Sequence, residues 1–182
     1  MILIPPRDTP GRDEKYMALA WFYAGFSKDP NTQVGSVIVD ENNIPLGHGY
    51  NGPPRQVDDA GFSWERPHPE NTGFTKYDIV VHAEINAIDH SYGGNICGST
   101  LYVTHFPCPR CMLEIARVGI SRVCYMDVKS DPNSSVSNQS FRERSKKVAE
   151  LGKVTLEEFV GNITWMADWI LRLRELGVFN HR

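Results

Sequence analysis

The chain has 182 residues, which is long enough for one domain with a full core and somewhat short for two. Its 41% hydrophobic and 23% charged residues are ordinary for a globular protein, and no apolar run approaches the roughly 18 residues of a membrane helix. A net charge of −3 without a basic stripe argues against long nucleic acid as a partner, because Lys and Arg must neutralise the phosphates.

The first residues, "MILIPP", are too short for the core of an export signal and are closed by two prolines. We therefore expect a cytoplasmic protein, in the host cytoplasm if the source is viral. Cysteines stay reduced in that compartment, which favours a metal-binding or catalytic use of the chain's four cysteines over disulfides.

The N-terminal half predicts a helix followed by a hairpin. Residues 14–26 carry apolar side chains at i, i+3, i+4 and i+7 from Met17, which is the pattern of a core-facing helix. Residues 34–40 are rich in β-branched side chains, and the turn "ENN" leads into a second extended stretch at 44–52. These two stretches predict a β-hairpin.

A long stretch at 52–77 contains many turn-forming residues and shows no periodicity. Loops of this length inside a compact domain are usually functional or disordered. Two aromatic side chains, Phe62 and Trp64, favour an ordered loop.

The second half alternates helices with strands, which predicts a largely parallel sheet with helices on its faces. The expected elements are a helix at 82–92 closed by Gly93 and Gly94, a strand at 99–106, a helix at 109–119, and strands at 121–126 and 153–159.

Two further segments are helical in pattern. Residues 140–150 mix basic and acidic side chains, as expected of a solvated helix face. Residues 162–177 carry a broad apolar stripe that either packs deep in the domain or contacts a neighbouring subunit.

Two short motifs, "HAE" at 82–84 and "PCPRC" at 107–111, each stand where a helix begins. Cys108 and Cys111 are spaced i, i+3 on one side of a first helical turn, whose positive end favours thiolates. His82 supplies a third ligand from the neighbouring helix. Three protein ligands suit a catalytic zinc ion, which keeps one coordination position open for water.

Glu84 gives this arrangement a proton carrier. A carboxylate two residues from a metal ligand is able to act as general base and then general acid. The H-x-E and P-C-x-x-C pair resembles the pattern of zinc deaminases, in which hydroxide attacks C4 of cytosine or C6 of adenine. Two alternatives stay open: a closed structural zinc site with His105 as fourth ligand, and a redox CxxC that leaves His82 and Glu84 without a role.

Longer matches carry a more specific resemblance. From Tyr16 to Phe159 the chain is similar to deoxycytidylate deaminases of the cytidine deaminase-like superfamily, through the segments "SKDPNTQVGSVIV", "GHGYNG", "TKYDIVVHAE", "HAEINAI", "THFPCPRC" and "GISRVCYMD". The resemblance implies an α/β fold with three α/β/α layers and a central mixed sheet of about five strands flanked by helices. Residues 1–182 would form a single domain with a loop insertion at 52–77 and an added C-terminal helix at 161–177.

The same resemblance implies an activity and its partners. These are zinc-dependent hydrolysis of dCMP to dUMP and ammonia, which supplies dUMP for thymidylate synthesis, and one catalytic Zn²⁺ per subunit. A homohexamer is expected, with dCTP as activator and dTTP as inhibitor, each bound with Mg²⁺. No membrane and no long nucleic acid are expected as partners.

Carried over residue by residue, the resemblance makes His82, Cys108 and Cys111 the zinc ligands and Glu84 the proton carrier. The implied substrate contacts are Ser27 and Lys28 for the phosphate, Asn51 for the sugar, and Tyr125 and the Ala83 backbone N–H for the base. The implied effector contacts are Gly52, Arg55 and Lys76.

The chain departs from the family pattern at three places. Some relatives hold a second, structural zinc ion through Cys and His in the long insertion, but this stretch offers only His68, so no second zinc site is expected. Phe26 stands where an arginine often precedes the phosphate-loop serine, so another cation is expected to bind the phosphate. The effector loop reads "GYNGPPRQ" and ends in Gln56 where relatives usually have glycine.

Alternative functions are the deamination of another free cytosine nucleotide such as dCTP, and a non-catalytic, zinc-stabilised nucleotide sensor. A polynucleotide-editing deaminase is disfavoured by the charge balance.

Overall fold

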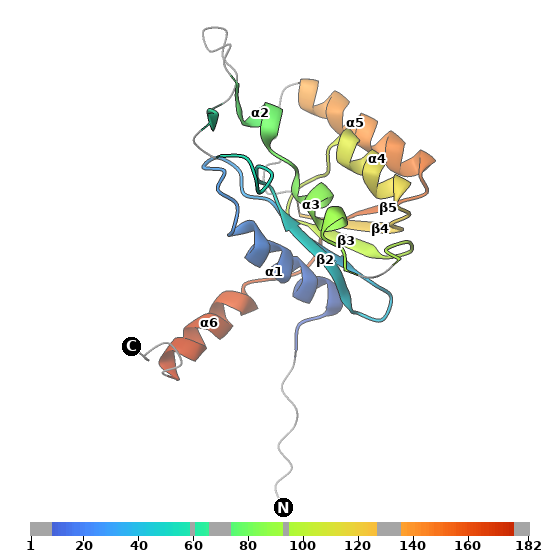
Figure 1. Cartoon of the computed structure of the whole chain (residues 1–182). Coiled ribbons are helices and arrows are strands. Elements are labelled where there is room, and N and C mark those ends of the chain that lie inside the picture. The colour runs from blue at the N-terminus through green and yellow to red at the C-terminus, as the bar shows by residue number, and fades with distance from the viewer. Residues whose placement is uncertain (1–8, 59–60, 66–73, 93–94, 127–135, 177–182) are drawn as a thin grey trace, which may run out of the picture.

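The structure is a computed structural model that describes residues 9–58, 61–65, 74–92, 95–126 and 136–176 (Figure 1). The glycines expected to close a helix, Gly93 and Gly94, lie outside the described residues, as do parts of the 52–77 loop and residue 177 of the C-terminal segment. No helix in the described part of the chain is long and apolar enough to span a membrane.

A five-stranded mixed sheet forms the centre of the domain, with strand order β2-β1-β3-β4-β5. Strand β1 runs antiparallel to both β2 and β3, whereas β3, β4 and β5 are parallel. The strand bounds are β1 Gly35–Val39, β2 Pro45–Tyr50, β3 Thr100–Val103, β4 Arg122–Tyr125 and β5 Thr155–Glu158. The predicted hairpin is confirmed as β1 and β2, and the mixed sheet is confirmed as well.

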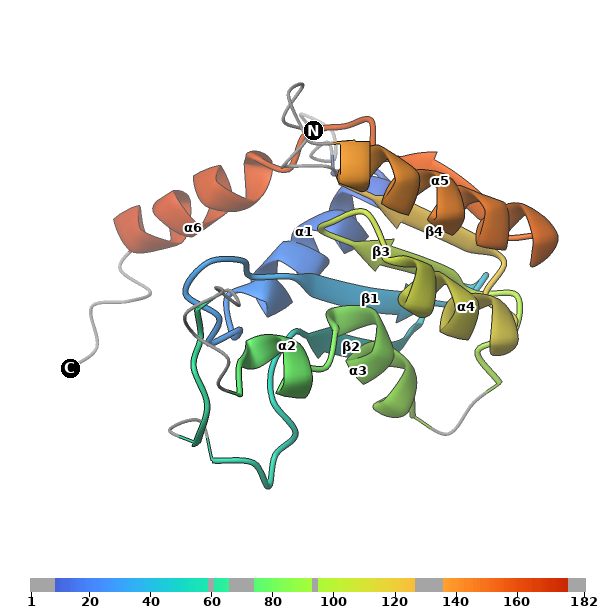
Figure 2. The same cartoon turned by 90° about the horizontal axis from the view of Figure 1, so that it is seen from above.

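Helices cover both faces of the sheet (Figures 1 and 2). Their bounds are α1 Arg12–Ala24, α2 Lys76–Ile79, α3 Ala83–Asp89, α4 Pro109–Arg117, α5 Val136–Leu151 and α6 Trp165–Glu175. Because successive side chains of a strand point to opposite faces, β1 feeds two cores: Val37 and Val39 pack with α1, while Ile38 packs with residues of α3, α4 and α5. This arrangement is the expected three-layer α/β/α fold.

Two glycines of β2 let α3 lie unusually close to the sheet. A Cβ at Gly49 would stand 2.4 Å from the carbonyl oxygen of Ala83, and one at Gly47 would stand 2.5 Å from that of Ala87. Any larger residue at either position would push against helix backbone. The glycines of "LGHGY" therefore set the position of α3, whose first turn carries HAE.

Two segments differ from the sequence prediction. The end of the 52–77 loop turns into α2, a four-residue helix that is too short to show periodicity. The N–H of Thr75, the N-cap of this helix, donates to Asp78 Oδ2 at 2.9 Å. The other is α5, which was expected to be a solvated face but packs one side against α4, with Ser145 fully buried.

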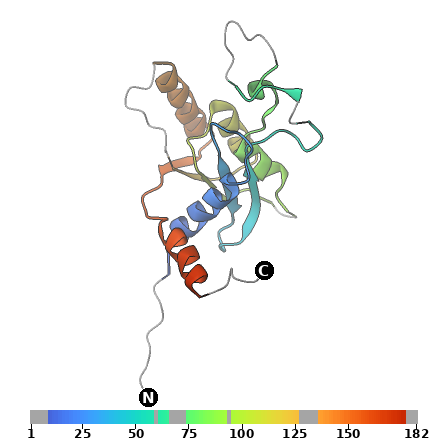
Figure 3. The same ribbon diagram turned by 90° about the vertical axis from the view of Figure 1, so that its left-hand side faces the viewer.

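The C-terminal helix α6 projects from the side of the domain (Figure 2) and lies at the end opposite α5 (Figure 3). None of its residues is buried, and Ile170 and Leu171 are 48% and 56% exposed. The Asn162 N–H, just before the helix, donates to Glu14 Oε1 of α1 at 3.0 Å. Of the two expectations for this segment, packing deep in its own domain is wrong.

Candidate active site

Two helix N-termini meet on one side of β3. His82 is the N-cap of α3, the helix before β3, and Cys108 is the N-cap of α4, the helix after it. The Cys108 thiol accepts a hydrogen bond from the Cys111 backbone N–H at 3.3 Å, in the manner of a side-chain cap. Pro109 follows at the first helical position, where a missing N–H costs nothing.

The three proposed ligands form a compact group. His82 Nδ1 lies 3.6 Å from Cys108 Sγ and 3.3 Å from Cys111 Sγ, and the candidate ligand atoms are all within 4.8 Å of one another. Zinc held tetrahedrally with ordinary Zn–N and Zn–S bonds requires an N···S separation of about 3.6 Å. The donor set and its spacing therefore fit a zinc ion.

Among the residues that the structure describes, this group holds three side chains and does not include His105. His105 lines the same pocket, and its Nδ1 lies 3.5 Å from Thr104 Oγ1. The described residues thus group three candidate ligands, which is the number that the expected catalytic zinc site uses.

The three side chains of the group change one another's pKa values through hydrogen bonds and charge. Hydrogen bonding to Cys108 raises the pKa of His82 to about 9. The hydrogen bond with Cys111, together with His82, lowers the pKa of Cys108 to about 4, while the same contact with Cys108 raises the pKa of Cys111. A metal ion binds the neutral imidazole and the deprotonated thiols, so its binding requires the release of the protons that these groups hold.

Glu84 lies in the first turn of α3, two residues after His82, and lines the pocket while only 3% exposed. Burial raises the pKa of its carboxyl group, and the nearby charge on His82 opposes that shift. A carboxyl group whose pKa is raised toward neutrality is suited to both accepting and returning a proton.

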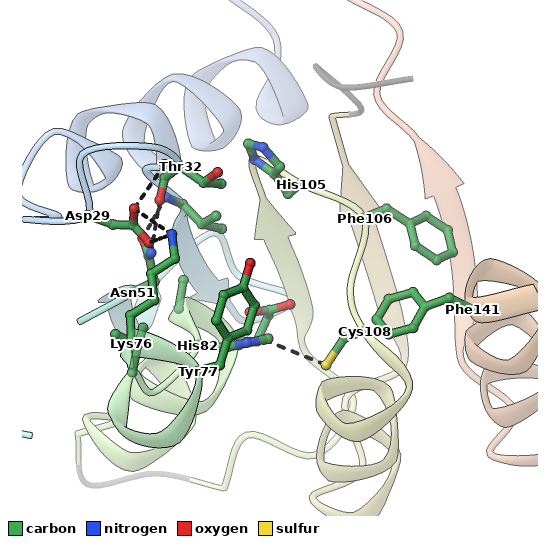
Figure 4. A pocket seen from close by; sticks show the side chains of 14 residues that line it. Asp29, Thr32, Asn51, Lys76, Tyr77, His82, His105, Phe106, Cys108 and Phe141 are labelled. Carbon is green, nitrogen blue, oxygen red and sulfur yellow. Dashed lines mark hydrogen bonds and ion pairs between the residues drawn. The ribbon is translucent and has the colours of Figure 1, made fainter. Parts of the chain in front are cut away.

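The pocket has a volume of about 290 Å³, close to the lower end of the range for small-molecule sites of about 300–1,000 Å³ (Figure 4). It is lined by residues from the loop after α1, the end of β2, α2, the start of α3, the β3–α4 loop and α5: Asp29, Thr32, Val34, Asn51, Lys76, Tyr77, Val80, His82, Ala83, Glu84, His105, Phe106, Cys108 and Phe141. A single small ligand fits this space.

Asn51 is the predicted substrate residue with the most constrained side chain. Its Oδ1 accepts from the Val34 N–H at 2.7 Å and its Nδ2 donates to the Thr32 carbonyl at 3.0 Å. It is 6% exposed and lines the pocket, as does Ala83. The amide group of Asn51 is therefore held in one orientation by the loop after α1.

Three other predicted substrate residues do not line the pocket. Ser27 Oγ donates to the Asn51 backbone carbonyl at 2.8 Å, so it holds the backbone of that residue without lining the pocket itself. Lys28 is exposed in the same loop. Tyr125 is 9% exposed and packs edge to face on Phe106 with ring centroids 5.0 Å apart.

The residues predicted for an effector site have different surroundings. Gly52 pairs with Val81 through reciprocal backbone hydrogen bonds of 3.1 and 2.9 Å, and Arg55 is exposed. Lys76 is buried in the pocket, where it forms an ion pair with Asp29.

Sequence reasoning did not single out seven of the lining residues as site residues, namely Asp29, Thr32, Val34, Tyr77, Val80, Phe106 and Phe141. Asp29 lies in the quoted segment "SKDPNTQ", which was a usable signal. Phe141 had none, because it comes from α5, far along the chain from both motifs.

Comparison of the amino-acid sequence with known proteins identifies a matching family and several similar relatives. The family model of the cytidine and deoxycytidylate deaminase zinc-binding region matches residues 10–127. Deoxycytidylate deaminase of Homo sapiens is 43% identical over 116 residues, covering 64% of this chain and 65% of that protein. Deoxycytidylate deaminase of Pongo abelii is 35% identical over 147 residues, covering 81% and 79%.

A solved structure is similar as well. The crystal structure of dCMP deaminase from the cyanophage S-TIM5 in complex with dCMP and dUMP matches with a TM-score of 0.61 and 26% identity, covering 84% of this chain and 100% of that one. The match to the human protein spans just under two thirds of that protein's length.

Proposed function

Because the chain belongs to the cytidine and deoxycytidylate deaminase family with its zinc-binding region, we propose that it hydrolyses dCMP to dUMP and ammonia. The observation that carries the proposal is the three-ligand group of His82, Cys108 and Cys111 beside a buried Glu84 in one small pocket. The similarity to deoxycytidylate deaminases and the dCMP and dUMP bound in the cyanophage structure favour dCMP as substrate. The product, dUMP, is the precursor used in thymidylate synthesis.

A zinc ion held by His82, Cys108 and Cys111 would lower the pKa of water to about 7 and so supply a nucleophile near neutral pH. Glu84 takes one proton from the attacking water and delivers it to ring nitrogen N3 of cytosine. The water oxygen bonds to C4, which becomes tetrahedral. Glu84 then carries the second water proton to the amino group, and the C4–N bond breaks. Ammonia leaves, and the ring becomes uracil with a proton on N3.

The pocket walls orient the substrate in this proposal. Asn51, held by Thr32 and Val34, presents its amide group to the sugar. The Ala83 N–H belongs to the first turn of α3, where backbone donors have no partner within the helix, and donates to the pyrimidine carbonyl. Lys28, in the loop that Ser27 anchors to Asn51, binds the phosphate.

The experiment that tests the function is ammonia release from a panel of free cytosine and adenine nucleotides, with and without dCTP. We expect dCMP to be the preferred substrate. A preference for dCTP would show that the substrate is that cytosine nucleotide and not dCMP. If no nucleotide released ammonia, the remaining hypothesis would be a non-catalytic, zinc-stabilised nucleotide sensor.

Glu84→Gln separates catalysis from metal binding. We expect the variant to keep its zinc content and to lose at least about 100-fold in dCMP turnover, because general acid–base catalysis typically contributes that much. Zinc content is measured by elemental analysis of the purified protein. Undiminished turnover in the zinc-loaded variant would remove Glu84 from the mechanism.

Regulation by dCTP and dTTP, each with Mg²⁺, and assembly into a homohexamer are further parts of the proposal. The backbone pairing of Gly52 with Val81 supports regulation, because it connects the start of the 52–77 loop to the residue before His82. The exposed apolar side chains of α6 support assembly. Rates that stay flat to saturating dTTP would refute the regulation, and a monomer by light scattering would refute the assembly.

A further inference from the structure

A buried ion pair forms part of the pocket wall at a distance from the metal ligands. Lys76 Nζ lies 2.7 Å from Asp29 Oδ2 and 2.9 Å from Asp29 Oδ1, and the two side chains are 8% and 4% exposed. Figure 4 shows the pair beside Asn51, across the pocket from Cys108. The mechanism above assigns no role to either residue.

Such a pair is a poor source of stability. Taking two charges out of water costs about as much as their attraction returns, so apolar residues of similar volume often serve the fold equally well. A buried pair in a pocket wall therefore calls for an explanation other than stability. The pair also joins segments 47 residues apart, namely the loop after α1 and the first residue of α2.

Asp29 is also hydrogen-bonded to the backbone of the loop after α1. Its Oδ1 also accepts hydrogen bonds from the N–H groups of Asn31 at 2.9 Å and Thr32 at 3.2 Å. The Thr32 carbonyl in turn accepts from Asn51 Nδ2 at 3.0 Å. An unbroken series of contacts thus runs from Lys76 through Asp29 and Thr32 to Asn51.

We propose that Lys76 and Asp29 are positioning residues that fix the Asn51 amide for the substrate sugar, and that Lys76 does not bind the substrate phosphate. Both carboxylate oxygens of Asp29 already face the Lys76 ammonium, so the pair presents no net charge to an anion. The inference rests on the proposed function, because it takes Asn51 as a substrate contact.

The test uses the double variant Asp29→Asn/Lys76→Met. The amide oxygen introduced by Asp29→Asn keeps an acceptor for the Asn31 and Thr32 N–H groups, and removing both charges together leaves no uncompensated charge in the pocket. The matched control is Lys146→Met, which removes a lysine from an exposed pair with Glu143 on α5. KM and kcat are measured with dCMP and with deoxycytidine, and dUMP affinity is measured by calorimetry.

We expect KM to rise about tenfold for both substrates in the double variant, the effect of losing one well-placed hydrogen bond, with kcat changed less than KM. The ratio of kcat/KM for dCMP to that for deoxycytidine should stay the same, zinc content should not change, and dUMP affinity should fall in parallel with KM. The Lys146→Met control should behave as wild type.

Two results would overturn the inference while the proposed function stands. A loss confined to dCMP would make Lys76 a direct phosphate ligand. Unchanged KM and dUMP affinity in the folded double variant would make the pair a purely structural feature. Failure of the wild-type chain to turn over dCMP would instead refute the proposed function, and this inference with it.

Discussion

A hydrogen bond between α5 and the β3–α4 loop, residues 104–108, allows a quantitative prediction. We call this segment the metal-binding loop because it carries the proposed ligand Cys108. Ser145 is fully buried, and its Oγ donates to the Pro107 carbonyl at 2.9 Å. Pro107 is itself buried and directly precedes Cys108, a proposed zinc ligand. In Ser145→Ala the carbonyl loses its donor in a place that water does not reach.

The cost follows from that burial. A buried polar group without its partner destabilises the fold by about 1–3 kcal/mol. For a domain of this size, a central value of about 2 kcal/mol lowers Tm by about 4–8 °C. Because the loop that carries Cys108 is then less restrained, we also expect zinc to pass to a chelator about tenfold faster, at the lower end of the effect of removing an outer-shell partner.

The assays are thermal unfolding of the zinc-loaded protein and zinc transfer to a chromogenic chelator. Ser140→Ala is the matched control, because Ser140 lies on the same helix but is exposed. It should leave both measurements unchanged. If Ser145→Ala also unfolds and releases zinc as wild type does, α5 does not position the metal-binding loop and the reasoning is wrong.

Three further predictions concern pH, assembly and the phosphate. The hydrogen bond from Arg122 lowers the pKa of Asp13 from its usual 3.8, so the pair stabilises the folded state above that pH and this contribution is lost as pH falls through the folded pKa. In urea unfolding at pH 3–6, the free energy of unfolding of wild type should exceed that of Asp13→Asn most at pH 6. The difference should be modest because the pair is partly solvated. A gap that widened toward pH 3 would contradict this. Ile170→Asp/Leu171→Asp should lower the mass measured by light scattering if α6 contacts another subunit, and an unchanged mass would exclude that contact. Lys28→Ala should reduce the preference for dCMP over deoxycytidine about tenfold, since one charged hydrogen bond is lost; an unchanged preference would show that another cation binds the phosphate.

Short-range patterns were read correctly from the sequence. The hairpin of β1 and β2, the helices at HAE and PCPRC, and the strand at Thr155–Glu158 were all expected near where they lie. Each depends on residues within a few positions of one another, through side-chain periodicity, turn residues and helix capping. The i, i+3 spacing of Cys108 and Cys111 is likewise a local property of a helical turn.

Contacts between distant segments were not accessible in this way. α5 was expected to be a solvated face, yet Ser145 is buried against the metal-binding loop and Phe141 lines the pocket. Nothing near Phe141 in the sequence distinguishes a side chain that faces a pocket from one that faces water. α6 has an apolar stripe, which a sequence shows equally well for a buried helix and for an exposed one.

By itself, the sequence determined the candidate ligand types, the carboxylate beside them and the order of the secondary structure, because local backbone geometry and donor chemistry suffice for these. Only the tertiary structure decided that His82 Nδ1 lies within 3.6 Å of both thiols and that Lys76 meets Asp29 across 47 residues. Those distances are set by how the fold brings the loop after α1 and the N-termini of α3 and α4 together around one pocket.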